Sequence, residues 1–179
     1  LGHPIDLGKA GKIAPGVEVL VGSNLNEGTL FVRGLGHDGT PADYAKWVHS
    51  QLGDMYANQV LALYPASNYR SPWWAATQVV TDAFMACPSR ATARDVAAIG
   101  QRSFLYQFTH EIDEVKLFDK WLGVFHASEL VFVYGLRDGI LPLPDHIPVP
   151  IVLGPGEIRL SDFFMSAWTL HAAGKNPWA

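Results

Sequence analysis

Two segments of this sequence have the composition of buried β-strands, and a long, mostly helical stretch separates them. Val17–Gly22 is a short apolar run that is rich in β-branched residues and ends at a glycine, as buried strands of parallel sheets do. Ser103–Thr109 is aromatic and partly alternating, which also favours a strand. Two strands do not make a stable sheet by themselves. We therefore expect an incomplete sheet, of which this chain carries a part.

The rest of the chain is predicted to be mainly helical, so the fold class is α/β, with few parallel strands and several helices. Thr40 has the position of an N-cap, followed by a proline at the first helical position. The predicted helices are Pro41–Leu52, Met55–Tyr64, Ser71–Met85, Pro88–Ile99, a short one ending at Val133, and Ser161–Ala173. The predicted irregular segments are Leu1–Gly16, His110–Val124 and the Gly- and Pro-rich surface excursion Gly135–Pro155.

The composition is that of a single globular domain. Of the 179 residues, 49% are hydrophobic and 17% are charged, which supplies apolar material for a core and argues against disorder. The 13 Lys and Arg residues are scattered and are outnumbered by 17 Asp and Glu residues, so no nucleic-acid-binding surface is expected. No apolar stretch is long enough to predict a membrane span.

The beginning of the chain and its one cysteine leave the cellular compartment open. Leu1–Ala10 does not read as a signal peptide, because it lacks a basic start followed by an apolar run. The first residue is not Met, so we expect a leader or a whole upstream part before it. Cys87 has no second cysteine with which to form an intrachain disulfide. Its place within helical segments predicts a buried, unreactive thiol.

Two polar residues follow the two predicted strands, where α/β sheets commonly place their chemistry. Glu27 lies in the polar turn after the first strand, and His126 lies beyond the second. A carboxylate in that place could orient a histidine, but it could also cap the next helix or pair with a base. A single histidine in an apolar setting is more often a hydrogen-bonded structural residue than a catalyst. Taken one at a time, both residues favour the structural interpretation.

Four segments of the chain stand out as motifs. They are Val21–Phe31 (VGSNLNEGTLF), Thr81–Pro88 (TDAFMACP), Leu122–Leu130 (LGVFHASEL) and Ser161–Trp168 (SDFFMSAW), the last followed by Gly174–Pro177 (GKNP). In this order they resemble the acid segment, the helix ending in Cys-Pro, the histidine segment and the last helix of type-B carboxylesterases, the cholinesterase-like family of the α/β-hydrolase superfamily. Because the resemblance covers nearly the whole chain, the chain is identified as the C-terminal portion of such a protein.

The resemblance implies a role for each matching residue. Glu27 would be the acid of the catalytic triad and His126 its general base and acid, in the chain order that α/β-hydrolases have. Glu129, one helical turn past the histidine, would be a structural anchor. Gly22 and Gly28 flank the acid turn and are expected to allow tight backbone geometry there. The resemblance implies no metal and no organic cofactor.

The departures from the family pattern concern the nucleophile. The chain has no Gly-x-Ser-x-Gly elbow and no glycine-rich segment that could supply oxyanion-hole amides; both lie upstream of the acid in the family. We therefore expect residues 1–179 to be a single partial α/β-hydrolase domain from a carboxylic ester hydrolase, inactive or nearly so alone. Its partners would be a small-molecule ester and the missing N-terminal part. The apolar surface left by that part could cause self-association.

The alternative function is a non-catalytic binding module, like the cholinesterase-like adhesion proteins. The presence of both triad candidates favours the enzyme. For three aromatic residues in or near these motifs, two roles are equally consistent with the sequence, contact with substrate and packing in the core. Phe125, Trp73 and Trp74 could line a pocket for the acyl or alcohol group of the substrate, and packing explains them equally well.

The other histidines are expected to lie in loops and to bind no metal. His110 with Glu111 and Asp113 fits no zinc-binding spacing, which favours a solvated loop. The same expectation holds for the dipeptides His37-Asp38 and Asp145-His146.

Overall fold

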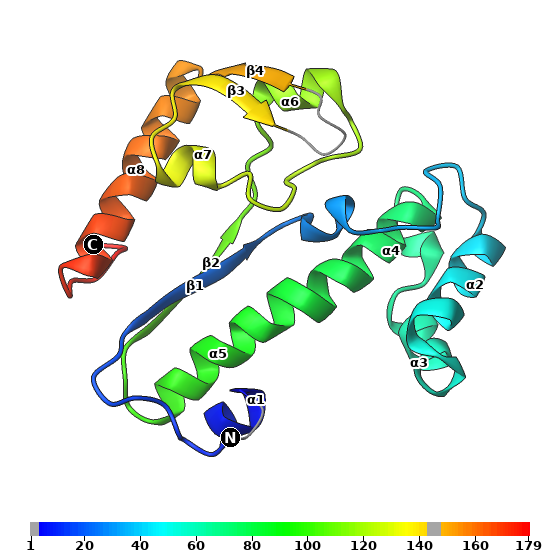
Figure 1. Cartoon of the computed structure of the whole chain (residues 1–179), viewed down its shortest axis with the longest axis horizontal. Helices are drawn as coiled ribbons and strands as arrows, with labels where there is room; N and C mark the ends of the chain where they lie inside the picture. Colours follow the sequence, from blue (N-terminus) through cyan, green and yellow to red (C-terminus); the bar gives the residue numbers. More distant parts are fainter. Residues whose placement is uncertain (1–3, 143–147) are drawn as a thin grey trace.

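The computed structural model describes residues 4–142 and 148–179 and has the α/β character expected from the sequence (Figure 1). Its central element is a pair of parallel strands, β1 (Val19–Asn24) and β2 (Ser103–Phe108). The register pairs Val19 with Ser103 and Asn24 with Phe108. Both strands lie within a residue or two of the predicted segments. Because they are parallel and paired from end to end, their carboxyl ends meet at one edge of the sheet.

A long helical excursion connects β1 to β2. It contains the 3-10 turns η1 (Glu27–Leu30) and η2 (Ala66–Asn68) and the helices α2 (Pro41–Leu52), α3 (Asp54–Leu63), α4 (Pro72–Thr81) and α5 (Cys87–Ala98). Thr40 caps α2 as predicted. Its hydroxyl accepts a hydrogen bond from the Asp43 amide at 3.2 Å, and the Asp43 carboxylate accepts one from the Thr40 amide at 3.1 Å. Helix α5 packs against both strands, and Figure 1 shows it running alongside them.

Helices α4 and α5 are joined by a π-helical turn, Asp82–Ala86, instead of being separate. Pro88 gives the physical reason. Proline has no N–H for a helical hydrogen bond, and its ring clashes with the carbonyl four residues earlier in a regular α-helix; a wider turn relieves the clash. Phe84, within this turn, is 70% exposed, and Cys87, directly after it, lies at the surface. The prediction of a buried Cys87 thiol is therefore wrong.

The described part of Gly135–Pro155 is a surface excursion only in its first half, because residues 136–140 are exposed whereas Val149 and Ile151 are buried. It contains the antiparallel strands β3 (Asp138–Pro142) and β4 (Pro148–Val152). In β4, Val149 and Ile151 are buried, whereas the residues that follow each of them are exposed. This is the period-two pattern of a half-buried strand, and the surrounding prolines and glycines conceal it in the sequence.

The described residues contain four further helices: α1 (Pro4–Lys9), α6 (Asp113–Phe118), α7 (Leu130–Val133) and α8 (Pro155–Ala172). The first lies in a segment predicted to be irregular and packs against α5. The second forms inside the predicted loop His110–Val124, where Val115 is buried. The last begins at Pro155, well before the predicted Ser161, because the Glu157 side chain caps its first turn. No helix in the described ranges combines the length and the apolar character needed to cross a membrane.

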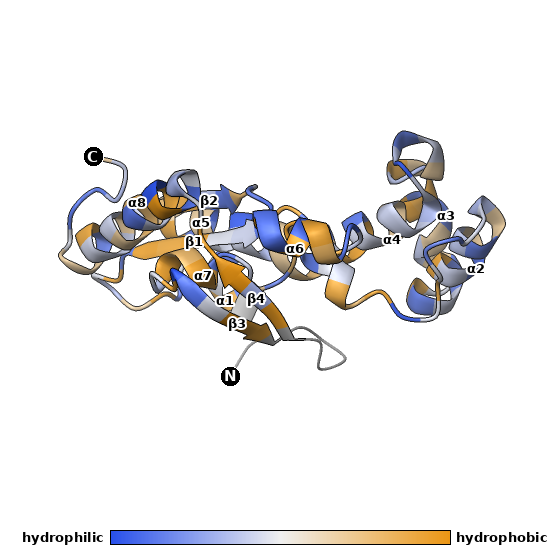
Figure 2. Ribbon diagram, turned by 90° about the horizontal axis from the view of Figure 1, so that it is seen from above, coloured by the Kyte–Doolittle hydropathy of each residue, from blue (hydrophilic) through white to orange (hydrophobic). Residues whose placement is uncertain are grey.

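The described residues contain two hydrophobic clusters, each of which forms the core of one part of the molecule. One is built around Phe108, Phe132 and Phe164, from β2, α7 and α8. The other is built around Tyr44 and Trp73, from α2 and α4. Figure 2 shows α2 and α3 set apart from the part that contains β1, β2 and α8. The turn η1 lies between the two clusters, since Leu30 packs against the first and Val32, just beyond the turn, belongs to the second.

Several large apolar side chains remain exposed. The most exposed are Leu117, Met55, Leu63, Tyr134, Phe84 and Ile140. Self-association through apolar surface left by the missing part of the fold stays a prediction.

Candidate active site

Glu27 and His126, the two residues singled out from the sequence, are in contact. Glu27 begins η1 just beyond the end of β1, and His126 lies in the loop that precedes α7. The Nδ1 atom of His126 is 2.7 Å from Oε2 of Glu27. The carboxylate side chain is 6% exposed and the imidazole side chain 43%. A buried carboxylate thus faces one nitrogen of a half-exposed imidazole.

The second oxygen of the Glu27 carboxylate is also bonded. Oε1 accepts a hydrogen bond from the main-chain N–H of Asn24 at 2.7 Å. Each oxygen of this buried carboxylate therefore has a partner, as a buried charge requires. With Nδ1 facing a carboxylate, a neutral imidazole carries its proton on Nδ1 and its lone pair on Nε2. This is the arrangement of a histidine that can act as a general base.

Asn26 joins the acid turn to the histidine loop by two hydrogen bonds. Its main-chain N–H donates to the Val124 carbonyl at 2.9 Å, and its Oδ1 accepts from the Val124 N–H at 3.0 Å. Gly123 makes this approach possible. Its φ is +56°, and a Cβ on it would lie 2.6 Å from Oδ1 of Asn26. The two Asn26–Val124 hydrogen bonds therefore hold the acid turn and the histidine loop together, in addition to the Glu27–His126 contact.

Asn24, the last residue of β1, makes a second connection between the loops. It is completely buried, and its Nδ2 donates to the Phe125 carbonyl at 2.8 Å. The same Nδ2 also contacts Oε2 of Glu129. Neither asparagine stood out as a candidate from the sequence. The available signal was an Asn-x-Asn-Glu run directly after a buried strand, because polar side chains at that place must find partners.

Glu129 is thus bonded to Asn24, which fits the anchoring role expected for it. Its charge also acts on Tyr106 in β2. Burial first, and then the negative charges of Glu129 and Glu27, raise the pKa of Tyr106 to about 12. The phenol therefore stays neutral beside the two carboxylates at ordinary pH.

Gly22 and Gly28 serve close packing. A Cβ on Gly22 would lie 2.4 Å from the ring of Tyr106, its partner residue in β2. A Cβ on Gly28 would lie 2.2 Å from the main-chain oxygen of Thr77 in α4. The Gly28 N–H donates to Oγ1 of Thr81 at 2.9 Å, one turn further along α4. Gly28 therefore lets η1, and with it Glu27, lie directly against the helix.

The immediate surroundings of His126 are an aromatic ring and a strained turn. The Phe31 ring lies edge-on to the imidazole, with 5.2 Å between the centroids. Ala127 has φ +71°, in the left-handed region that residues other than glycine seldom adopt. Such strain persists where the surrounding contacts fix the backbone. In this loop the strained residue, Ala127, directly follows His126 in the chain.

The three aromatic residues expected near substrate lie in the two cores. Phe125 is 4% exposed and belongs to the cluster around Phe108. Trp73 and Trp74 belong to the cluster of α2 and α4. Trp73 also lines a cavity of about 400 Å³, with Leu30 of η1 as another of its walls. Trp74 lines another cavity of about 400 Å³, with Asn26 of the acid turn and Gly123 of the histidine loop among its other walls. Packing therefore accounts for Phe125, whereas both tryptophans belong to a core and also line cavities beside the acid turn.

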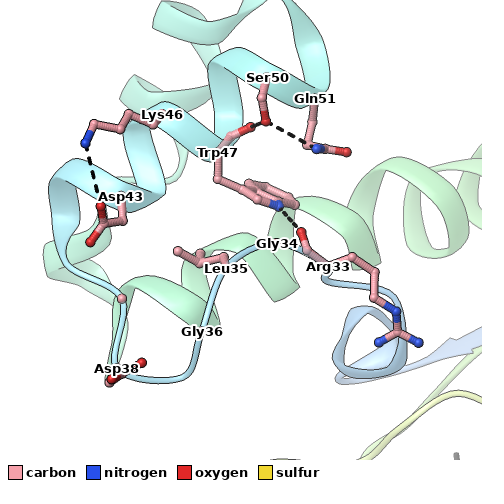
Figure 3. Close-up of a pocket in the computed structure, with 11 residues that line it drawn as sticks. Arg33, Gly34, Leu35, Gly36, Asp38, Asp43, Lys46, Trp47, Ser50 and Gln51 are labelled. Atoms are coloured by element: carbon pink, nitrogen blue, oxygen red, sulfur yellow. Dashed lines mark hydrogen bonds and ion pairs between the residues drawn. The ribbon is translucent and has the colours of Figure 1, made fainter.

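Another cavity, of about 520 Å³, is separate from the Glu27–His126 contact. It lies between the loop that starts at Arg33 and helix α2 (Figure 3). Trp47 closes one side, and its Nε1 donates to the Arg33 carbonyl at 2.8 Å. Asp43 and Lys46 form an exposed ion pair at its rim. None of the residues expected to be catalytic lines this cavity.

His110 is not in a freely solvated loop. Its Nε2 is 2.8 Å from Oε1 of Glu157, which also accepts the Asp113 N–H at 3.1 Å. Oε2 of Glu157 accepts the Gly154 N–H at 3.1 Å. The side chains of His110, Asp113 and Glu157 each have one potential metal-ligand atom, and these atoms lie within 4.8 Å of one another. Because both Glu157 oxygens already hold main-chain amides, the group is best explained as the cap of α8.

The electrostatics of Glu157 agree with that interpretation. Burial raises the pKa of its carboxyl, but the hydrogen bonds from His110, Asp113 and Gly154 outweigh burial and leave the pKa below its ordinary value. Of the other two dipeptides, His37-Asp38 lies in a loop, where His37 stacks on Trp121. Asp145-His146 lies outside the described residues.

A family model described as the carboxylesterase family matches residues 1–177. Among curated proteins, acetylcholinesterase from Leptinotarsa decemlineata is 28% identical over 149 residues, which are 74% of this chain and 23% of that protein. Acetylcholinesterase from Bungarus fasciatus is 32% identical over 99 residues, 55% of this chain and 15% of that protein. The chain therefore spans less than a quarter of the length of these relatives.

The backbone fold of this chain is similar to part of the fold in solved structures of esterases. A structure titled PNB esterase matches with a TM-score of 0.57 and 24% identity and covers 87% of this chain and 29% of that one. A thermophilic PNB esterase matches with the same TM-score, 22% identity and the same coverage. These likenesses confirm the expected fold class, part of an α/β-hydrolase fold.

Proposed function

This chain belongs to the carboxylesterase family, and we propose that in the whole protein Glu27 and His126 are the acid and the histidine of a serine-based triad that hydrolyses carboxylic esters. The observation that carries the proposal is the 2.7 Å contact between Nδ1 of His126 and Oε2 of Glu27. These residues come from distant parts of the chain and follow two adjacent parallel strands. The names of the relatives, all of them esterases, support an ester as the substrate.

In the proposed reaction, a serine hydroxyl from another part of the protein attacks the ester carbonyl. Nε2 of His126 accepts the hydroxyl proton while the oxygen–carbon bond forms. The intermediate then breaks its bond to the alcohol oxygen, which takes the proton from Nε2 and leaves. Water attacks the acyl-serine by the same proton transfers, which releases the acid and restores the serine. No metal or organic cofactor takes part in this scheme.

The role of Glu27 is to hold the imidazole and to stabilise its charged form. The Nδ1–H bond to Oε2 keeps the lone pair on Nε2, and the carboxylate offsets the positive charge that appears when Nε2 takes the proton. The Asn24 N–H on Oε1 keeps the carboxylate from rotating. A glutamate is longer than an aspartate, and the close approach of Gly28 to α4 fits the backbone position that this length demands.

We do not assign the nucleophilic serine to any residue of this chain. None of its 179 residues forms a Gly-x-Ser-x-Gly elbow, which is where α/β-hydrolases carry the serine. We therefore expect this chain alone to hydrolyse p-nitrophenyl acetate at close to the background rate. A clear rate that is lost in His126→Ala would show that the nucleophile lies within the chain.

The decisive test is ester hydrolysis by the complete protein that contains this chain. His126→Ala and Glu27→Gln should each lower kcat for p-nitrophenyl acetate, the former by about 10³-fold or more. His49 and Asp54 provide a matched control, because His49 Nδ1 lies 2.6 Å from Asp54 Oδ1 on the exposed surface. His49→Ala should leave kcat unchanged. If the complete protein has no esterase activity, the binding-module alternative replaces the proposal. If it is an esterase whose kcat His126→Ala does not reduce, the assignment of His126 to the triad is wrong.

A further inference from the structure

Asn24 lies between the two proposed triad members without belonging to the triad. It is the last residue of β1 and is completely buried. Burying an amide side chain is unfavourable unless its polar atoms find partners. Its Nδ2 donates to the Phe125 carbonyl at 2.8 Å and contacts Oε2 of Glu129. These two partners stand on either side of His126 in the chain, so one amino group holds both flanks of the histidine loop.

The main chain of the same residue reaches the acid. The Asn24 N–H donates to Oε1 of Glu27 at 2.7 Å, which leaves Oε2 for Nδ1 of His126. Asn24 therefore contacts the acid through its backbone and the histidine loop through its side chain. Because it closes the hydrogen-bonded strand β1, its position is fixed by the pairing with Phe108 at the end of β2.

The side chain acts here as a donor. Its Oδ1 is buried and has no hydrogen-bond partner among the described residues. Nδ2 faces the Phe125 carbonyl, a Glu129 carboxylate oxygen and, at 3.5 Å, Oγ of Ser128. An aspartate has almost the same shape but no N–H to donate. At this position its charge would face two acceptors and repel both.

We propose that Asn24 is a positioning residue that sets the orientation of His126 against Glu27. The proposal rests on the proposed function of that pair. The strained φ of +71° at Ala127 shows that the histidine loop does not relax to its preferred backbone, and the Asn24 amino group is bonded on both sides of that residue. Without it, the loop moves toward an unstrained turn and carries the imidazole away from the carboxylate.

The structure offers a control for a purely structural role. Ser161 is also completely buried, and its hydroxyl donates to the Phe132 carbonyl at 2.9 Å. This bond joins α8 to α7 and is of the same kind as that from Asn24 to Phe125. Ser161→Ala should therefore cost stability without changing the imidazole of His126.

The first readout is spectroscopic and needs no activity. In the ¹⁵N-histidine-labelled full chain, the neutral imidazole of His126 in the wild type should be the Nδ1–H tautomer, with a low-field Nδ1 proton. Asn24→Ala and Asn24→Asp should shift the ring nitrogens toward the Nε2–H tautomer and remove that proton signal, whereas Ser161→Ala should retain both. Unchanged tautomer and proton signals in the Asn24 variants would overturn the proposal.

The second readout is kinetic and uses the complete protein. Asn24→Ala should lower kcat by about 10- to 100-fold with little change in KM, because a displacement of the order of 1 Å has that effect on a catalytic group. Asn24→Asp should be at least as impaired despite its conserved shape. Normal kcat in both variants, with loss in Glu27→Gln, would refute the Asn24 proposal alone. Normal kcat in Glu27→Gln and His126→Ala would refute the proposed function.

A wild-type measurement covers the case in which the Asn24 variants do not fold. The Asn24 main-chain amide should exchange with solvent at least 100-fold more slowly than the amide of the exposed Gly34, since it is buried and bonded to Glu27. Equal exchange rates at the two amides would show that the Asn24–Glu27 bond is not maintained in solution, and the proposal would fall.

Discussion

Gly28→Ala adds one methyl group at the point where the acid turn touches helix α4, and its effect follows from the geometry. The new Cβ would lie 2.2 Å from the Thr77 carbonyl oxygen and 2.9 Å from Cβ of Val80. The oxygen belongs to the helix backbone and cannot rotate aside. To restore an ordinary contact, η1 must move away from α4 by about 1 Å. We therefore expect two effects of this substitution, a displacement of Glu27 and a loss of stability.

The expected magnitude is that of an overpacked core, about 1–3 kcal/mol. For a chain of this length each kcal/mol lowers Tm by about 2–4 °C. A 1 Å displacement of the Glu27 carboxylate would lengthen its 2.7 Å contact with His126 beyond hydrogen-bonding distance. In the complete protein, kcat should therefore fall by about 10²-fold, together with Tm.

The assay is thermal unfolding followed by circular dichroism, combined with p-nitrophenyl acetate hydrolysis by the complete protein. Gly156→Ala is the matched control, because the nearest atom to its new Cβ is a flexible Arg159 nitrogen at 3.9 Å. In a helix this change should be neutral or stabilising by up to about 1 kcal/mol. If Gly28→Ala melts like the control and keeps its kcat, then the turn does not depend on its approach to α4, and our reading of Gly28 is wrong.

Three other predictions concern stability. Asn26→Ala should cost about 1–3 kcal/mol in urea denaturation, since the buried Val124 N–H loses its acceptor, and Asn26→Asp, which keeps an acceptor, should cost less. Ile151→Ala should cost about 2–5 kcal/mol, whereas Val152→Ala, at an exposed position of the same strand, should cost little; equal losses would argue against the β3–β4 hairpin. The folded-state pKa of Glu157 is below its ordinary value of 4.5, so its stabilising contribution is complete above the unfolded-state pKa and is lost as the pH falls through the folded-state pKa. Glu157→Gln should therefore lower Tm at pH 7 and make Tm less dependent on pH below about 4.5, and an unchanged acid profile would contradict this.

Local chemistry made much of the architecture predictable. Val17–Gly22 had β-branched residues and a closing glycine, and Thr40 stood before a proline, so β1 and α2 could be placed closely. The pairing of Glu27 with His126 was expected from the resemblance of their segments to those of type-B carboxylesterases. For β1 and α2 the deciding interactions lay within a few residues.

The π-helical turn before Pro88 is a local response of one helix to a proline. The other unpredicted features depend on contacts between distant segments. The burial of β4 comes from a core that the alternating residues Val149 and Ile151 enter from a proline-rich segment. The role of Asn24 was hidden for the same reason, because its partners Phe125 and Glu129 lie about 100 residues away.

The direct pairing of β1 with β2 means that the spacing of Glu27 and His126 is set by the strand ladder, in which Asn24 stands opposite Phe108. The helices α2 and α3 lie on a loop that leaves and returns without contributing to that ladder. Their length and shape can therefore be exchanged, by natural variation or by grafting from another member of the family, while the two side chains keep their separation. The same architecture lets one part of the chain diversify and another stay constant.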